Sequence, residues 1–446
     1  MRDALLRAGD RPLLIMGERR RSGAELEARA GALARELDAA GLRGRRIGLW
    51  QQNAFASVEA HLAVEWVAAT RVPVDPGAAP AEAAAVFAAA GVDAVVADLA
   101  HAAALGGDAL VHDDARPTGD GGFAPVAADP DTVLHLFPRS VEGGELRGVP
   151  VSYGNWAARL DQSEALLRDG TYGPPLGADE CFLTAQQVMH GTSMIGTFPF
   201  LRLGLPQVLL ERFDARTALD AIVAHGVTTT FFVPGMVTRL VEALDGRELP
   251  LRRLLYGGAP FPREELLAAT RALGDRLVQL YGHWAGAWPI SVLSGADHLR
   301  ILREDTPIGA SCGRPVMEIK LRGGELCVRG PMVVRDYADP DGWYGLGDLA
   351  ELDADGYLYL RGRLDGLINT GAYHVYPREI EEALTALPGV RAARVTGEQD
   401  PKWGQAITAY VVGDGEADAL RAALRTRLAA YKVPKRIEFV TALEPR

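Results

Sequence analysis

Lysine is scarce in this chain of 446 residues, which contains only Lys320, Lys402, Lys432 and Lys435. Arginine supplies every other positive charge, and the formal net charge is −11. No run rich in lysine or arginine occurs, and the isoelectric point is about 5.4. We therefore expect no partner with a phosphate backbone, such as DNA or RNA.

Cysteine is also rare, and its three occurrences, Cys181, Cys312 and Cys327, lie far apart. Their odd number and wide spacing exclude a disulfide framework and a CxxC metal pair, and they fit a reducing compartment. No apolar run reaches the roughly 18 residues of a membrane helix, and the N-terminal apolar stretch is too short for a signal peptide. We expect a cytoplasmic protein with no membrane partner and no metal site.

What is present is an ordinary globular composition, with 48% hydrophobic and 24% charged residues. At about 150 residues per domain, the length predicts roughly three domains or lobes. Residues 22–41 read as a helix, because Ser22 and Glu25 form a capping box and leucines recur at helical spacing. Short apolar runs at 47–50, 72–74, 94–97 and 133–137 alternate with helical stretches. A second half repeats the pattern at 218–244.

This alternation predicts an α/β fold with layers around a largely parallel sheet. Beyond Arg361 the pattern changes to a small α+β segment. There we expect helices at 378–387 and 417–430, and strands at 390–395, 407–412 and 436–440.

Three ordered motifs carry a family resemblance. They are GELCVRG at 324–330, Gly347-Asp348, and GRLDGLINTGAYHVYPREIE at 362–381. From Arg21 to its C-terminal end the chain resembles the adenylate-forming superfamily of acyl-CoA synthetases, adenylation domains and luciferases. The resemblance implies a large N-terminal domain at 1–361, which binds an acyl group and the nucleotide, and a small mobile C-terminal domain at 362–446.

The same resemblance assigns individual residues. Asp365 falls at the hinge with Arg363 before it, and Asp348 matches the carboxylate that holds the ribose hydroxyls. Gly371 lies in the loop that approaches the phosphopantetheine arm, where a missing side chain permits close contact. The thiol partner implied is coenzyme A or the phosphopantetheine of an acyl carrier protein.

The phosphate loop of the family is altered here. The matching segment, 139–148, keeps Ser140, Gly144 and Gly148, but brings in Val141 and Glu142. A carboxylate at ~4 Å from a phosphate oxygen costs about 4 kcal/mol per unit charge near a surface. Arg147 remains as a group that can contact a phosphate.

Two further family features are missing. In Tyr281-Gly282-His283-Trp284-Ala285 the family's phosphate-binding Thr and magnesium-binding Glu are replaced by Trp284 and Ala285, which offer Mg²⁺ no oxygen ligand. The sequence stops at Arg446, where the segment leading to the family's catalytic lysine would begin. These departures predict that ATP and magnesium are not used.

The acyl pocket of the family matches positions around Gly257, Gly258, Ala259, Tyr281, Gly282 and Trp284. His190 and His283 are the candidate catalytic bases beside it. Backbone N–H groups near Gly257, Gly258 or Gly282 are candidate oxyanion donors. The aromatic residues favour an aryl or short acyl group.

The sequence favours acyl or aryl transfer between thioesters, on CoA or a carrier protein and without ATP. A second hypothesis keeps an ATP-dependent acid–thiol ligase with unusual phosphate contacts through Arg147, Asp348 and Arg363. A third is a non-catalytic homologue that docks a carrier protein. Transfer of an acyl group without ATP distinguishes the first, and acid-dependent pyrophosphate release the second.

Overall fold

A computed structural model describes residues 1–117, 122–142, 145–177, 179–304, 306–364, 367–371 and 373–443, except the side chains of 140–142. Asp365 and Gly144 lie outside the described residues, and so does the Ser140 side chain. The described strands form four sheets, of six, nine, four and five strands.

The first sheet is parallel except at one edge, where β7 and β8 form a long antiparallel hairpin. Its strands, in spatial order, are β6 (Leu110–Val111), β5 (Ala94–Ala97), β3 (Arg46–Trp50), β4 (Thr70–Pro73), β7 (Val133–Glu142) and β8 (Glu145–Ser152). Its helices are α2 (Gly23–Ala39), α3 (Phe55–Trp66), α4 (Pro80–Ala90) and α5 (Leu99–Ala104), and the short α1 (Arg2–Ala8) precedes them.

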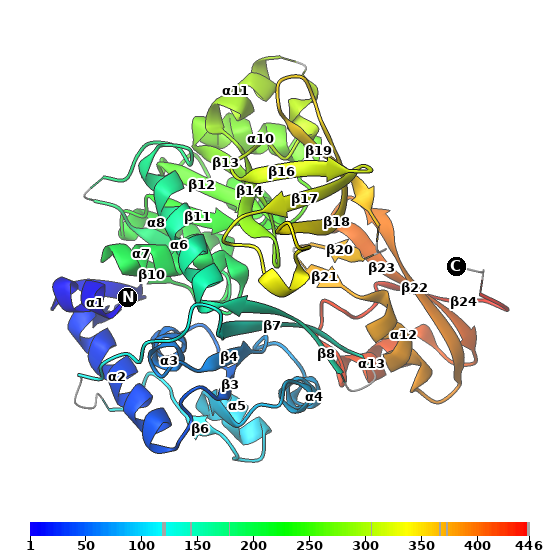
Figure 1. Ribbon diagram of the computed structural model, residues 1–446. Helices are drawn as coiled ribbons and strands as arrows, with labels where there is room; N and C mark the ends of the chain where they lie inside the picture. The colour runs from blue at the N-terminus through cyan, green and yellow to red at the C-terminus, as the bar shows by residue number, and fades with distance from the viewer. Residues whose placement is uncertain are drawn as a thin grey trace.

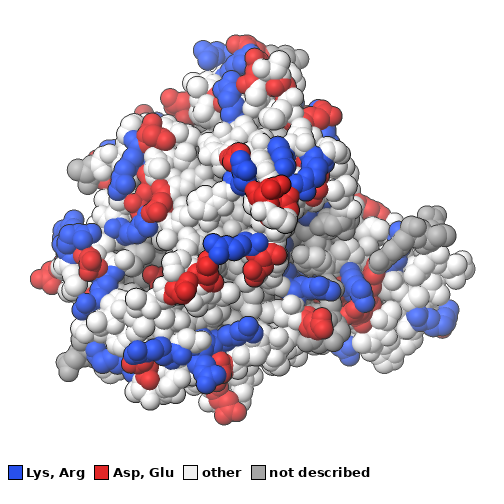
Figure 2. Space-filling model, viewed as in Figure 1, with Lys and Arg blue, Asp and Glu red and all other residues white. Residues whose placement is uncertain are grey.

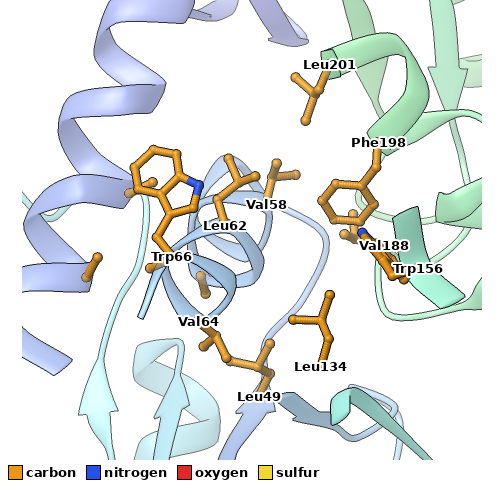
Figure 3. Packing of buried hydrophobic residues seen from close by; sticks show 14 of the residues in the cluster. Leu49, Val58, Leu62, Val64, Trp66, Leu134, Trp156, Val188, Phe198 and Leu201 are labelled. Atoms are coloured by element: carbon orange, nitrogen blue, oxygen red, sulfur yellow. The ribbon is translucent and has the colours of Figure 1, made fainter. Parts of the chain in front are cut away.

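Helix α3 is the centre of the largest apolar core. All of its residues except Glu65 are buried, so the helix is enclosed on every side. Its buried Glu59 is paired with Arg29 and His112, as a buried charge must be. Figure 3 shows Val58, Leu62 and Trp66 of this helix near Leu49 and Leu134 of the first sheet and near Trp156, Phe198 and Leu201 from helices of the second half. The core therefore joins the two halves of the N-terminal region into one packed body.

The second sheet is parallel from β1 to β13 and antiparallel at both edges. Its strands run in the order β15 (Arg314–Pro315), β14 (Ala287–Leu293), β13 (Leu277–His283), β12 (Arg253–Gly257), β11 (Thr229–Phe232), β9 (Phe182–Thr184), β10 (Gln207–Leu209), β1 (Pro12–Met16) and β2 (Arg19–Ser22). The helices of this half are α6 (Tyr153–Arg168), α7 (Thr197–Leu203), α8 (Ala215–Ala224), α9 (Pro234–Glu242), α10 (Arg263–Leu273) and α11 (Gly295–Arg303).

Two smaller sheets complete the chain. An antiparallel one holds β16 (Glu318–Arg322), β17 (Glu325–Arg329), β18 (Trp343–Leu352) and β19 (Leu358–Arg363). The C-terminal one holds β20 (Ile368–Thr370), β21 (Tyr373–Val375), β22 (Val390–Asp400), β23 (Gly404–Gly413) and β24 (Arg436–Phe439), with α12 (Pro377–Thr385) and α13 (Ala417–Arg425). In Figure 1 this orange and red part lies beside α4 and the β7–β8 hairpin.

The predicted α/β fold with a small C-terminal α+β domain is confirmed. The capping box is present too, since Ser22 Oγ accepts from the Glu25 N–H at 3.1 Å. Two details differ. Helix α13 ends at Arg425 instead of residue 430, and residues 139–142 and 145–148 belong to strands β7 and β8, in which Ser140 faces Arg147 across the pair. The predicted domain boundary between 361 and 362 falls inside β19.

Charge is mixed over the surface in view, where Figure 2 shows acidic and basic side chains interspersed. Among the helices that the structure describes, none is long and apolar enough to cross a membrane.

Candidate active site

Asp348 is held by two partners, one from the neighbouring strand and one from a different sheet. Its carboxylate accepts a hydrogen bond from the Tyr281 hydroxyl at 2.5 Å and from Arg363 Nη1 at 2.7 Å. The β18–β19 register places Arg363 directly opposite Asp348, and Tyr281 comes from β13. Burial and the adjacent carboxylate raise the pKa of Tyr281, so its hydroxyl remains a donor. Three residues singled out from the sequence thus converge.

A cavity of about 400 Å³ opens beside this cluster, between the β7–β8 hairpin and the C-terminal domain. Arg139, Arg147 and Arg363 line it, together with His283 and His374. Among the described lining residues Glu325 supplies the single carboxylate, against three guanidinium groups. A cavity with this excess of positive charge favours an anionic ligand.

Trp284 forms one wall of the cavity and fixes its neighbours. Its ring centroid lies 4.6 Å from that of Phe137, and the Arg139 guanidinium lies over it at 5.4 Å. A Cβ at Gly191 would lie 3.0 Å from the indole, so a larger residue there would require the ring to shift slightly. Trp284 therefore aligns Arg139 through a cation–π contact.

Two histidines line the cavity, and only His283 was predicted from the sequence. His283 Nδ1 accepts from the Ala285 N–H at 3.3 Å, which leaves the proton of the neutral ring on Nε2. His374 was not singled out from the sequence, although it lies within the 362–381 motif. Burial first, and then Arg139, His283 and Arg363, hold its pKa well below the ordinary value. Strand alternation in β21 is the signal that would have found it, because Tyr373 and His374 point to opposite faces.

His190 lies in a different environment. Its Nε2 is 3.9 Å from Asp75 Oδ2, and its ring meets Tyr373 edge-on with 5.9 Å between centroids. Burial lowers the pKa of His190, and Asp75 only partly opposes that effect. The ring is therefore neutral near pH 7 and able to accept a proton.

The glycines of the predicted acyl wall are required by packing. A Cβ on Gly257 would lie 2.1 Å from the Leu280 oxygen of the neighbouring strand, and one on Gly282 would lie 2.6 Å from the Trp288 ring. Gly258 has φ +86°, and Ala259 after it is half-buried. These residues lie at the carboxyl ends of strands β12 and β13.

Gly371 also has a structural reason to be glycine. Its φ is +65°, and the nearest side chain to a Cβ there is Trp403, at 3.5 Å. Its predicted approach to a pantetheine arm stays a prediction, as does the hinge role of Asp365. Across the part of the chain that the structure describes, no group of three or more His, Cys, Asp or Glu is placed to hold a metal ion.

Comparison with known families identifies the chain. The family model described as AMP-binding enzyme matches residues 1–338, and that of the AMP-binding enzyme C-terminal domain matches 379–445. This chain belongs to the AMP-binding enzyme family. Its relatives are acyl-CoA synthetases of the adenylate-forming superfamily, as the sequence motifs implied.

Among curated proteins, feruloyl-CoA synthase from Amycolatopsis sp is 32% identical over 455 residues, covering 94% of this chain and 90% of the synthase. The 2-succinylbenzoate–CoA ligase of Bacillus cereus (strain Q1) is 33% identical over 327 residues. That match spans 67% of this chain and 64% of the length of the ligase.

Solved structures give full-length matches. The amide bond synthetase McbA from Marinactinospora thermotolerans is 30% identical, with a TM-score of 0.86 over 99% of this chain and 96% of that one. The o-succinylbenzoate CoA synthetase from Bacillus subtilis, bound with its product analogue OSB-NCoA, is 25% identical with a TM-score of 0.88 over 100% and 94%. A malonyl-CoA ligase with methylmalonyl-CoA and AMP bound is 27% identical, with a TM-score of 0.84 over 100% of both chains.

These relatives correct the functional prediction. Acyl transfer between thioesters without ATP is wrong as the leading interpretation, because the matched enzymes are named CoA ligases and synthetases. The doubt about ATP and magnesium is wrong for the same reason, since the Bacillus subtilis synthetase has been solved with ATP and magnesium ion. No relative named here points to a carrier protein.

Proposed function

We propose that this chain is an ATP-dependent ligase that joins a carboxylic acid to the thiol of coenzyme A. The observation that carries the proposal is the cavity lined by Arg139, Arg147 and Arg363, which adjoins the buried Asp348. Both substrates bear phosphates, and three guanidinium groups suit that chemistry. The named CoA ligases among its relatives support the same reaction.

In the first step a carboxylate oxygen of the acid attacks the α-phosphorus of ATP, an acyl–adenylate bond forms, and pyrophosphate leaves. Asp348 is the group we assign to the ribose hydroxyls, which would compete for it with Tyr281 and Arg363. Arg139 and Arg147 stabilise the negative charge that builds on the phosphates. They act in place of the family's altered loop contacts.

Magnesium enters as part of the MgATP substrate. Mg²⁺ keeps several waters and is bound by substrate phosphates with one or two carboxylates, so a dedicated cage is not required. Glu325 lines the cavity and offers one such carboxylate. Its Oε1 already accepts from the Gly347 N–H at 3.0 Å, which fixes its orientation.

In the second step the sulfur of CoA attacks the acyl carbonyl carbon, AMP leaves, and the thiol proton passes to a base. We assign His190 as that base, because its ring is neutral near pH 7 and Asp75 lies 3.9 Å away to stabilise its protonated form. His283 serves as a donor instead, since its Nδ1 is already an acceptor for Ala285.

An aryl or short acid is the substrate class we favour. Trp288 meets Phe231 edge-on with 6.2 Å between centroids, and both rings are buried. The Trp288 ring lies against Gly282, so we expect these rings to leave little room for a long acyl chain. The acid-binding wall is then Gly257, Gly258, Ala259 and Gly282.

Pyrophosphate release tests the first step. The purified chain is incubated with MgATP and a panel of aryl, short and long-chain acids, with CoA omitted and hydroxylamine added to trap the adenylate. Acid-dependent release with an aryl or short acid supports the proposal. If none of the acids in the panel causes pyrophosphate release, the proposal is refuted. Adding CoA, a phosphopantetheinyl carrier protein or a simple amine to parallel reactions then identifies the acceptor.

A further inference from the structure

Lys432 is buried where the C-terminal domain meets the N-terminal one. Its Nζ lies 2.7 Å from Glu82 Oε1 on α4 and 2.8 Å from Glu379 Oε1 on α12. Only 6% of the lysine side chain is exposed, against 11% for Glu82. Glu379 belongs to the same domain as Lys432, whereas Glu82 lies 350 residues away in sequence.

Because these charged groups are buried, each of them depends on its partner for stability. A buried ammonium group is stable only when paired, and a buried carboxylate left alone is strongly unfavourable. The second oxygen of Glu82 is itself buried, with no hydrogen-bond partner among the described residues. If the two domains separated, Glu82 would therefore become solvated, while Lys432 would stay paired with Glu379.

Aromatic contacts extend the same interface towards the proposed base. Tyr431 stacks on Tyr373 with 3.9 Å between ring centroids, and Tyr373 meets the His190 ring edge-on. His190 and Asp75 come from the N-terminal domain, and both tyrosines from the C-terminal one. The position of the C-terminal domain thus determines the surroundings of His190.

One relative has been solved in several forms, and this chain is not equally similar to all of them. Its TM-score is 0.88 to a double mutant of the Bacillus subtilis synthetase bound with OSB-NCoA. Its TM-score is 0.71 to that synthetase with ATP and magnesium ion, and 0.71 to the form with the acyl-adenylate OSB-AMP. The structure in which Lys432 contacts Glu82 is therefore more similar to the CoA-analogue complex than to the ATP or acyl-adenylate complexes.

We infer that Glu82 and Lys432 are positioning residues for the thiol step: their ion pair holds the C-terminal domain in the arrangement used for transfer to CoA. The inference rests on the proposed ligase function. Neither residue touches the reacting atoms. Because we assign the pair to the arrangement of the second step, its loss is expected to slow that step and to leave the first unaffected.

The kinetic test measures the two half-reactions separately in Glu82→Gln, which keeps the shape of the side chain and removes its charge. We expect adenylate formation within about twofold of the parent and single-turnover transfer from preformed adenylate to CoA at least tenfold slower. Glu379→Gln is the matched control, since it removes a charge from the same lysine without crossing the interface, and its ratio of the two rates should match the parent. Equal slowing of both steps by Glu82→Gln, or no slowing, would overturn the inference.

A distance measurement tests the contact without catalysis. The native cysteines are buried, so labels attach to Cys introduced at the exposed Leu99 and Glu438, one in each domain. We expect one dominant distance in the parent and in Glu379→Gln, and a second population in Glu82→Gln. An unchanged distance distribution in Glu82→Gln would refute the positioning role of the Glu82–Lys432 ion pair, even if the chain proved to form no adenylate. Failure of adenylation alone would refute the proposed function instead.

Discussion

Removing the cavity's positive charge gives the sharpest prediction about nucleotide binding. The perturbation is the double variant Arg139→Gln and Arg147→Gln, with each substitution also made alone. Both arginines line the cavity, and the first is held over the Trp284 ring, so neither substitution removes a core side chain. The fold should therefore survive while the charge is lost.

The magnitude follows from Coulomb's law. A guanidinium about 5 Å from a phosphate oxygen contributes about 3 kcal/mol at an effective dielectric of 20, and screening at physiological salt roughly halves it. About 1.5 kcal/mol corresponds to roughly a tenfold weaker Kd for each single variant. Because the two groups are neighbours, their effects need not add, and we expect the double variant to lose between about 10-fold and 100-fold.

Titration calorimetry with MgATP at three salt concentrations is the assay. The parent's affinity should fall more steeply with salt than that of the double variant, because fewer charges remain to be screened. Arg391→Gln is the matched control, since this exposed arginine pairs with Asp414 and does not line the cavity. A double variant that binds MgATP within twofold of the parent, or a control that loses as much, would refute the reasoning.

Three further predictions concern single residues. Tyr281→Phe removes the hydroxyl bonded to Asp348 and should change the KM for ATP by about fivefold to tenfold with little effect on thermal stability, measured by steady-state kinetics and melting; an unchanged KM contradicts that contact. His190→Asn should slow transfer to CoA on the order of 10²-fold and spare adenylation, and the parent's transfer rate should stay flat down to below pH 6.5 because the pKa of His190 is lowered. Glu180→Gln should destabilise the fold by about 3–5 kcal/mol, since it leaves the buried Arg253 unpaired. Burial raises the pKa of Glu180, but hydrogen bonds from Thr228, Arg253 and Gly177 outweigh it and lower the pKa. This stability is therefore present above about pH 4.3 and lost as the pH falls further, which denaturant titrations at pH 7 and about pH 3 would detect.

Local rules in the sequence were sufficient for most of the fold. The capping box at Ser22 and the apolar runs of β3 and β5 follow from short-range chemistry, so their positions were predicted within a residue or two. The β7–β8 hairpin was not, because its glycines suggested the family's phosphate loop, while its strand pairing depends on the neighbouring β4.

The candidate site was predicted in part. Asp348, Tyr281 and Arg363 were singled out from motifs, and the β18–β19 register brings two of them together. The cationic character of the cavity was missed, because only the tertiary fold brings Arg363 of β19 to Arg139 and Arg147 of the β7–β8 pair. The replacement of the family's Thr and Glu by Trp284 and Ala285 was visible in the sequence. The positive charge of the arginines around the cavity, which compensates for that loss, was not visible. That imbalance led to the wrong prediction of a reaction without ATP.

The stoichiometry of products tests the central claim most directly. The chain is incubated with MgATP, CoA and the acid that gives the fastest pyrophosphate release, and AMP and acyl-CoA are quantified together by mass spectrometry. A ligase predicts one AMP for each acyl-CoA, and no acyl-CoA when ATP is omitted. Acyl-CoA formed from another thioester without ATP, with no AMP from any acid, would contradict the account.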